Sequence, residues 1–164
     1  MRKFICLSCV LLLLGGSAVA GPFEPELVEA DLLPGSNAVV PGQPLRLALR
    51  LRMRKDWHVY WKNPGEAGQA TRMDLNLPEG FELVRIDWPL PRRFEQPGGI
   101  TGYGYQKEAV FVITIDTPER LYEGQTVRIG LDASWLACLD TCIPGEKELS
   151  LKLPVRRKAE AANR

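Results

Sequence analysis

The sequence has little of what would tie a protein to nucleic acid or to a membrane interior. Its 164 residues include 21 Lys and Arg against 20 Asp and Glu, and a single histidine. So balanced a charge creates no field that would attract nucleic acid or an anionic lipid surface. No stretch reaches the roughly 18 apolar residues of a membrane-spanning helix, and no segment sustains a helical period. We therefore expect neither a transmembrane segment nor a helical domain.

The first twenty residues have the pattern of a secretory signal peptide. Arg2 and Lys3 precede an apolar stretch from Phe4 to Leu14, and Ala18-Val19-Ala20 supplies the small residues of a cleavage site. The apolar stretch is too short and wrongly flanked for a spanning helix. We therefore expect residues 1–20 to be removed on export to the periplasm, which leaves 19 basic and 20 acidic residues.

Cysteines are few, and the signal peptide takes two of the four, Cys6 and Cys9. The remaining Cys138 and Cys142 would tend to pair in an oxidising compartment. In an extended chain their Cα atoms would lie about 13 Å apart, whereas a disulfide needs them within about 7 Å. The chain must therefore bend across 139–141, where Asp and Thr favour a turn. We expect the pair at a strand end or loop that a partner protein can reach.

Alternating apolar and polar residues predict seven or eight short strands separated by Pro and Gly. The expected strands cover residues 45–53, 58–62, 73–77, 81–88, 109–116, 126–135 and 149–155. Strands at this spacing favour an all-β fold, an immunoglobulin-like antiparallel β-sandwich over residues 21–155. We expect its first part, to residue 43, to be poorly ordered or an edge segment. The charged residues 156–164 read as a flexible, frayed tail.

Three uses of the cysteine pair stay open on the residues alone. A structural bridge closing about five residues would contribute roughly 2 kcal/mol, against nearly 5 for a loop of about 100, which argues against a stability role. A redox pair fits better, because short-loop bridges tend to be easier to reduce. Two thiolates could also hold copper(I) with His58 or a methionine. However, there is one histidine, and Met53 and Met73 fall at core-facing positions.

The immediate sequence neighbours do not activate either thiol. Asp140 lies between the cysteines and would disfavour a thiolate, and no Lys, Arg or His is adjacent. Activating groups must therefore come from residues that the fold brings in. His58 lies among Trp57, Tyr60 and Trp61, where a lone histidine is more often packed and hydrogen-bonded than catalytic. We assign these aromatic residues to core or rim packing first, and to a partner surface second.

Four segments, taken in order, resemble a known family. They are WHVYWKNPGEAG (Trp57–Gly68), IDWPLPRRF (Ile86–Phe94), GITGYGY (Gly99–Tyr105) and WLACLDTCIPGE (Trp135–Glu146). Together they resemble the N-terminal periplasmic domain of DsbD-type thiol:disulfide interchange proteins, and within these the ScsB-like branch. The resemblance covers roughly residues 40–155 and implies an immunoglobulin-like sandwich that exchanges disulfides without a cofactor or a metal.

The resemblance also implies roles for individual residues. Cys142 would form the mixed disulfide with a partner, and Cys138 would resolve it. The family's cap loop, which shields the pair until a partner displaces it, corresponds to Gly99–Tyr105. Gly99 would let this loop move, and Tyr103 or Tyr105 would cover the sulfurs. The spacing of three residues between the cysteines is shorter than in the best-known DsbD domains, so the geometry of the bridge is expected to differ.

The partners are implied in the same way. Family members receive electrons from a membrane-embedded conduit through a thioredoxin-like domain. They pass them to periplasmic thiol-disulfide proteins such as disulfide isomerases, cytochrome c maturation factors or, in the ScsB branch, stress-related thiol proteins. No membrane or thioredoxin-like segment follows the sandwich here, so we expect either separately encoded partners or a stand-alone relay. We expect a monomer with protein-disulfide reductase activity as part of this relay.

Overall fold

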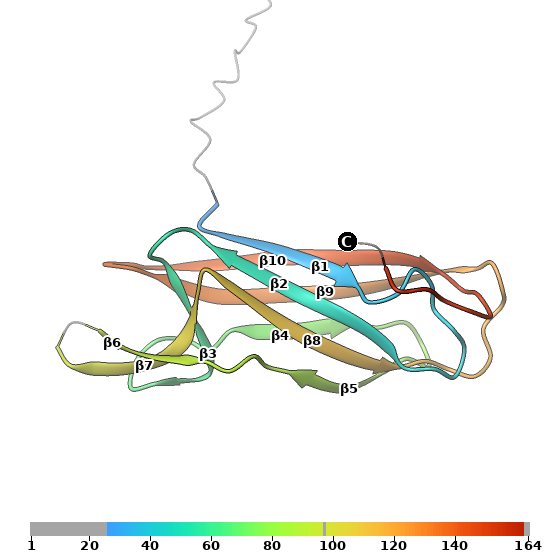
Figure 1. Ribbon diagram of the computed structural model, residues 1–164, viewed down its shortest axis with the longest axis horizontal. Helices are drawn as coiled ribbons and strands as arrows, with labels where there is room; N and C mark the ends of the chain where they lie inside the picture. The colour runs from blue at the N-terminus through green and yellow to red at the C-terminus, as the bar shows by residue number, and fades with distance from the viewer. Residues whose placement is uncertain (1–25, 97, 163–164) are drawn as a thin grey trace, which may run out of the picture.

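The computed structural model describes residues 26–96 and 98–162, and within them every regular element is a β-strand (Figure 1). Over this part of the chain, no helix is long and apolar enough to cross a membrane. The predicted signal peptide lies outside the described residues. The ten strands are β1 (Val28–Pro34), β2 (Leu45–Met53), β3 (His58–Gly65), β4 (Arg72–Asn76), β5 (Glu82–Asp87), β6 (Arg92–Gln96), β7 (Ile100–Gln106), β8 (Glu108–Asp116), β9 (Thr126–Cys138) and β10 (Cys142–Pro154).

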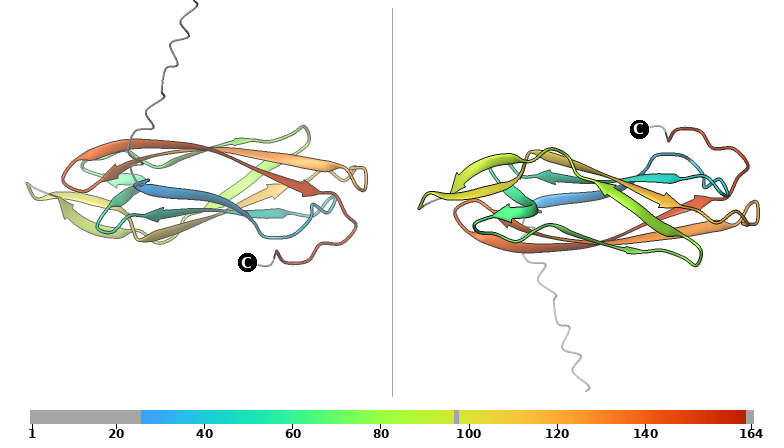
Figure 2. Two further views of the ribbon diagram at one scale, coloured as in Figure 1. Left: turned by 90° about the horizontal axis from the view of Figure 1, so that it is seen from above. Right: turned by 90° about the horizontal axis from the view of Figure 1, so that it is seen from below.

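The strands form two antiparallel sheets packed face to face, so the expected sandwich is confirmed. One sheet has the order β1-β2-β8-β5, and the other has the order β10-β9-β3-β7-β6, with β4 paired to β9 as its sixth strand. Figure 2 shows the two layers from opposite sides of an elongated molecule. The β6–β7 and β9–β10 turns lie at the same end of the sandwich, on the left in Figure 1.

The core follows from the period of two along the longer strands. On β2 every second residue from Leu45 to Met53 is buried, and on β9 every second residue from Val127 to Ala137 is buried. Residues that alternate in a strand point to opposite faces, so each strand contributes one apolar row to the space between the sheets. The outward rows are mostly charged or polar. This alternation is what made the strands readable from the sequence.

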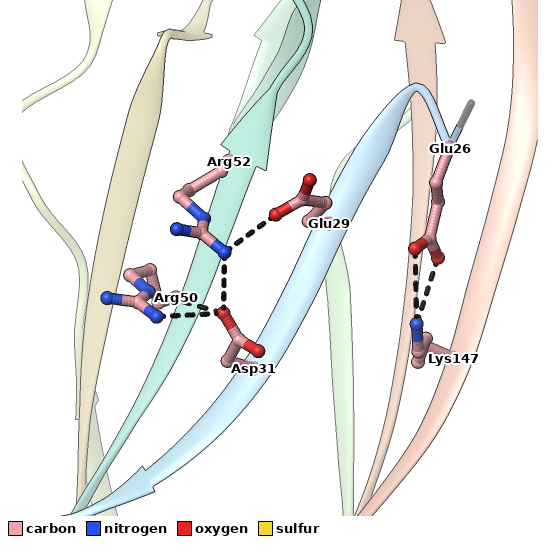
Figure 3. Close-up of polar contacts among 6 residues, drawn as sticks. All are labelled: Glu26, Glu29, Asp31, Arg50, Arg52 and Lys147. Atoms are coloured by element: carbon pink, nitrogen blue, oxygen red, sulfur yellow. Dashed lines mark hydrogen bonds and ion pairs between the residues drawn. The ribbon is translucent and has the colours of Figure 1, made fainter.

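Strand β1 is the edge of the four-stranded sheet, in agreement with the expected edge segment. It pairs with β2 alone, with Leu32 opposite Leu49. Ion pairs lie along its outer face and join its start to β10: Arg50–Asp31 at 3.0 Å, Arg52–Glu29 at 2.6 Å and Lys147–Glu26 at 3.0 Å (Figure 3). Exposed pairs of this kind contribute about 0–1 kcal/mol each. Burial of the apolar row of β1 therefore holds the strand, and the charges help to fix its register.

Two segments differ from the sequence-based expectations. Residues 156–162 do not fray but follow the segment after β1, with backbone hydrogen bonds from Arg156 N to Val39 O and from Asn37 N to Glu160 O. Bound backbone groups override the charged, Ala-rich composition that suggested a loose end. The stretch expected to be a cap loop is strand β7, whose residues 100–104 pair with β6 in a hairpin. Both hairpin strands lack the apolar alternation of the core strands.

Candidate redox site

Cys138 and Cys142 lie opposite each other where β9 and β10 join. Cys138 is the last residue of β9, Cys142 is the first of β10, and they form the last pair in the register of this hairpin. The bend across 139–141 is closed by a hydrogen bond from Leu139 N to Thr141 O, 3.1 Å long. It brings the two Cα atoms to 4.1 Å, and the sulfurs form a disulfide. The expected bend is therefore present, and the expected pairing is made.

The two sulfurs differ in their access to solvent. The Cys138 residue is 2% exposed, whereas Cys142 is exposed. The difference arises from the order of the strands: β9 lies inside its sheet, with His58 of β3 opposite Cys138, while β10 is the edge strand. The exposed side chains of Leu139 and Ile143 flank Cys142. A partner thiol or disulfide can therefore reach Cys142 directly, but it cannot reach Cys138 unless something moves.

A buried chain of hydrogen bonds ends on the inner sulfur. The Tyr60 hydroxyl donates to Cys138 Sγ at 3.5 Å, and Gln96 Nε2 donates to the Tyr60 oxygen at 2.9 Å. Burial raises the pKa of Tyr60 above its ordinary value, so the hydroxyl keeps its proton and remains a donor. A donor aimed at sulfur stabilises a thiolate more than a thiol. The fold thus supplies the activating group that the sequence neighbours of Cys138 lack.

The position of Tyr60 depends on the glycine of the following loop. Gly68 has a φ of 101°, and a Cβ at that position would overlap the Tyr60 ring. The loop returns along β3, where Thr71 donates its hydroxyl to Tyr60 O at 2.7 Å. Only glycine combines this backbone conformation with so close an approach. Gly68 ends the segment Trp57–Gly68, which carries part of the family resemblance. This segment therefore packs against the Tyr60 ring.

His58 packs beside Tyr60 on the face that carries Cys138. Its ring lies 5.2 Å from the Tyr60 ring, edge to face, and 4.4 Å from the Phe94 ring. The residue is 7% exposed, and burial lowers the pKa of the imidazole. His58 is therefore packed as expected. It is not hydrogen-bonded as expected at Nε2, which is buried and has no hydrogen-bond partner among residues 26–96 and 98–162.

The β6–β7 hairpin covers this cluster with a residue that the sequence analysis did not select. Phe94 of β6 lies across Gly102 of β7 and reaches the His58 and Tyr60 rings. A Cβ on Gly102 would meet the Phe94 ring at 2.6 Å, so the glycine makes room for the aromatic cover. The signal available in the sequence was an aromatic residue just before a Gly-rich hairpin.

The predicted cap residues lie in the same hairpin but in different places. Gly99 is at its turn, with a φ of 77° and open space around it. Tyr103 is half-buried and pairs with Arg93. Tyr105 is a core residue: its hydroxyl donates to Pro89 O at 2.9 Å, and its ring packs edge-on against Phe111. Tyr60 thus contacts the Cys138 sulfur and Phe94 contacts the Tyr60 and His58 rings, whereas Tyr105 points into the core.

In the described part of the chain, no three His, Cys, Asp or Glu side chains are grouped so that they could hold an ion. Met53 is buried in the core, and Met73 packs against the core from outside. The chemistry that the site offers is thiol-disulfide exchange between one exposed and one buried sulfur.

Comparison with known proteins agrees with this geometry. The family model described as "Thiol:disulfide interchange protein DsbD, N-terminal" matches residues 29–154, which include both cysteines and nearly the whole sandwich. The chain belongs to the DsbD N-terminal domain family. Members of this family take part in thiol:disulfide exchange, and in this DsbD-type domain Cys138 and Cys142 form the disulfide. No curated protein matches the sequence significantly.

Solved structures with the same fold include periplasmic domains. The N-terminal periplasmic domain of ScsB from Proteus mirabilis matches with a TM-score of 0.53 and 23% identity, over 76% of this chain. This chain spans 44% of the length of that ScsB chain. The reduced DsbD N-terminal domain of Neisseria meningitidis matches with a TM-score of 0.47 and 12% identity, over 80% of this chain and 90% of that one.

Proposed function

We propose that this domain relays electrons to periplasmic disulfide proteins through the Cys138–Cys142 pair. The observation that carries the proposal is the asymmetry of the pair: one sulfur is exposed on an edge strand, and the other is buried under a tyrosine hydroxyl. Exchange through a mixed disulfide needs one sulfur that the partner can reach and a second sulfur nearby that displaces the partner. Family membership supports the same chemistry.

In the forward step the dithiol form of the domain reduces a partner. The Cys142 thiolate attacks the partner's disulfide, so a Cys142–partner bond forms and the electron pair of the broken bond leaves with the partner's second sulfur. Cys138 then attacks Cys142 Sγ and restores the bridge. The partner's first sulfur leaves with the electron pair, so the partner gains two electrons and the domain loses two. No cofactor is needed.

Reduction of the bridge would come from the opposite side of the relay. We propose that a thioredoxin-like domain fed by a membrane-embedded DsbD- or ScsB-type conduit attacks Cys142 and leaves the domain as the dithiol. Disulfide isomerases, cytochrome c maturation factors and stress-related thiol proteins are the classes of electron acceptor. A monomer suffices, because one chain holds both sulfurs.

The β6–β7 hairpin would act as the cover of the buried sulfur. Phe94 closes the His58–Tyr60 cluster from above, and Gln96 of the same strand donates to the Tyr60 hydroxyl. Gly98 and Gly99 at the hairpin turn have positive φ and open surroundings. Lifting the hairpin would break the Gln96 bond and expose Cys138 at the same time. A docking partner that lifts the hairpin would therefore reach Cys138 in addition to the exposed Cys142.

A non-catalytic sandwich with a structural bridge is the rival function, and the reduction potential separates the two. Because a relay must cycle, we expect the Cys138–Cys142 potential to be less negative than about −300 mV, the region below which structural bridges lie. The measurement is the fraction of dithiol at equilibrium in glutathione or dithiothreitol buffers, read as the mass added on alkylation. The double variant Cys138→Ser/Cys142→Ser is the blank. A potential below that limit would leave only the structural role.

A further inference from the structure

We propose that His58 accepts the proton of the Cys138 thiol when Cys138 closes the bridge and releases the partner. This inference rests on the proposed function, because it assigns the proton in the resolving step. His58 is the one histidine of the sequence, and the exchange steps above give it no role.

The register of the sheet places the two side chains together. His58 and Cys138 are directly opposite each other on the neighbouring strands β3 and β9. Residues opposite each other project from the same face of a sheet, with Cβ atoms about 4.5–5.5 Å apart. The same face carries Tyr60, which contacts both the His58 ring and Cys138 Sγ. Reduction frees the Cys138 side chain to turn from Cys142 toward this cluster.

The unpartnered nitrogen is the second observation. Buried polar atoms are almost always hydrogen-bonded, and an exception points to a partner absent from that state. In the disulfide form, Cys138 has no proton to donate, and His58 Nε2 is buried without a partner in the described structure. In the dithiol form, Cys138 carries an S–H donor, and a neutral imidazole nitrogen is a suitable acceptor. Reduction therefore supplies the hydrogen bond that the oxidised state lacks.

The surroundings keep the imidazole neutral and ready to accept. Burial lowers its pKa from the ordinary value of 6.5. The elements packed against the ring otherwise present Phe94 and Gln96 of β6 and Gln106 of β7, all uncharged. On this face, the titratable and charged groups of β3, of β6 and of the end of β9 are Tyr60, the exposed Lys62, the exposed Arg92 and Cys138. The acidic residues of the same face lie further along the strands, with Glu146 and Glu148 on β10, Asp132 on β9 and Asp74 on β4. None of these carboxylates is on a residue paired with His58 or Cys138.

The resolving step then balances as follows. The Cys138 proton moves to His58, and the resulting thiolate attacks Cys142 Sγ of the mixed disulfide. The Cys138–Cys142 bond forms, the Cys142–partner bond breaks, and its electron pair leaves with the partner's sulfur. That thiolate takes up the proton from the imidazolium, directly or through water. His58 ends neutral, so it is ready for another cycle.

A small aromatic disulfide tests this step without a protein partner. The reduced domain, prepared without a histidine tag, is mixed with 5,5′-dithiobis(2-nitrobenzoate), and release of the coloured thiolate is followed by stopped flow from pH 5 to 9. The first release reports attack by Cys142, and the second reports resolution by Cys138. We expect His58→Gln and His58→Phe to slow the second release about 5- to 10-fold at pH 7. The first release should stay within twofold of wild type.

The pH profile distinguishes a proton acceptor from a packing residue. In the wild type, the second rate should rise with pH through the lowered pKa of His58, below 6.5, because the neutral imidazole is the active form. Both variants should lose that rise and keep only the one that follows thiol ionisation. Equal profiles in either folded variant and wild type would overturn the proposal. Two independent additions of the reagent, with no second release, would instead refute the resolving role of Cys138.

Discussion

Replacing Cys138 with serine is expected to trap a covalent complex between Cys142 and its physiological partner. Serine removes the sulfur that restores the bridge, while Cys142 stays exposed at the start of β10 and can still attack a disulfide. The mixed disulfide then has no intramolecular route of release, so its lifetime should rise by orders of magnitude. The measurement is a band of higher mass on a non-reducing gel of periplasmic extract, which disappears on reduction.

The matched control is the same change at the other sulfur. Cys142→Ser should give no adduct and no electron transfer, because Cys138 is 2% exposed and lies under Tyr60. The double variant measures background. An adduct with Cys142→Ser but none with Cys138→Ser would reverse the two roles. Absence of an adduct in both single variants would argue for a structural bridge.

The second large effect is expected when the aromatic cover is removed. Phe94→Ala deletes two ring contacts, with His58 at 4.4 Å and Tyr60 at 5.9 Å between ring centroids. Such contacts contribute about 0.5–1.5 kcal/mol each, so their loss should raise the population of the open hairpin about 5- to 100-fold. In the reduced domain, we expect alkylation of Cys138 to accelerate by that factor. Alkylation of Cys142, which is already exposed, should hardly change.

The comparison of the two cysteines within one sample makes this experiment specific. Mass spectrometry after brief exposure to iodoacetamide gives both rates at once, and a thermal melt shows whether the sandwich remains folded. Leu139→Ala is the control variant, because Leu139 is an exposed apolar residue of the bend between the two cysteines and lies outside the β6–β7 hairpin. Equal acceleration at both cysteines would indicate general loosening, and no acceleration at Cys138 would show that Phe94 is not its cover.

Much of the fold was predictable because the pattern that encodes a strand is local. Apolar and polar residues alternate from Leu45 to Met53 and from Val127 to Trp135, and this alternation identifies the residues that face the core. The identification does not require knowing which strand is the neighbour. The β6–β7 hairpin was missed as a pair of strands because it covers a site at one end and buries no apolar row. The ordered path of residues 156–162 was not predicted. It depends on backbone hydrogen bonds to residues 35–39, and the amino-acid composition does not reveal such bonds.

The sequence predicted which two cysteines form the site, but it did not predict which residues surround them. Four residues of sequence separation force Cys138 and Cys142 to share a turn. By contrast, the Tyr60–Cys138 contact spans 78 residues, and the Tyr60–Gln96 contact spans 36. These contacts exist because β3 lies between β9 and β7. Such an order of strands cannot be read from any single segment.

The sequence by itself determined the class of fold and a cysteine pair held at a bend, because each depends on neighbours along the chain. Only the tertiary structure decided which sulfur is exposed. It also placed His58 and Tyr60 against Cys138 and put Phe94 over them. The physical reason is strand pairing. The hydrogen bond on Cys138 comes from β3, which lies next to β9, and β6 acts on it through Tyr60 from the other side of β7.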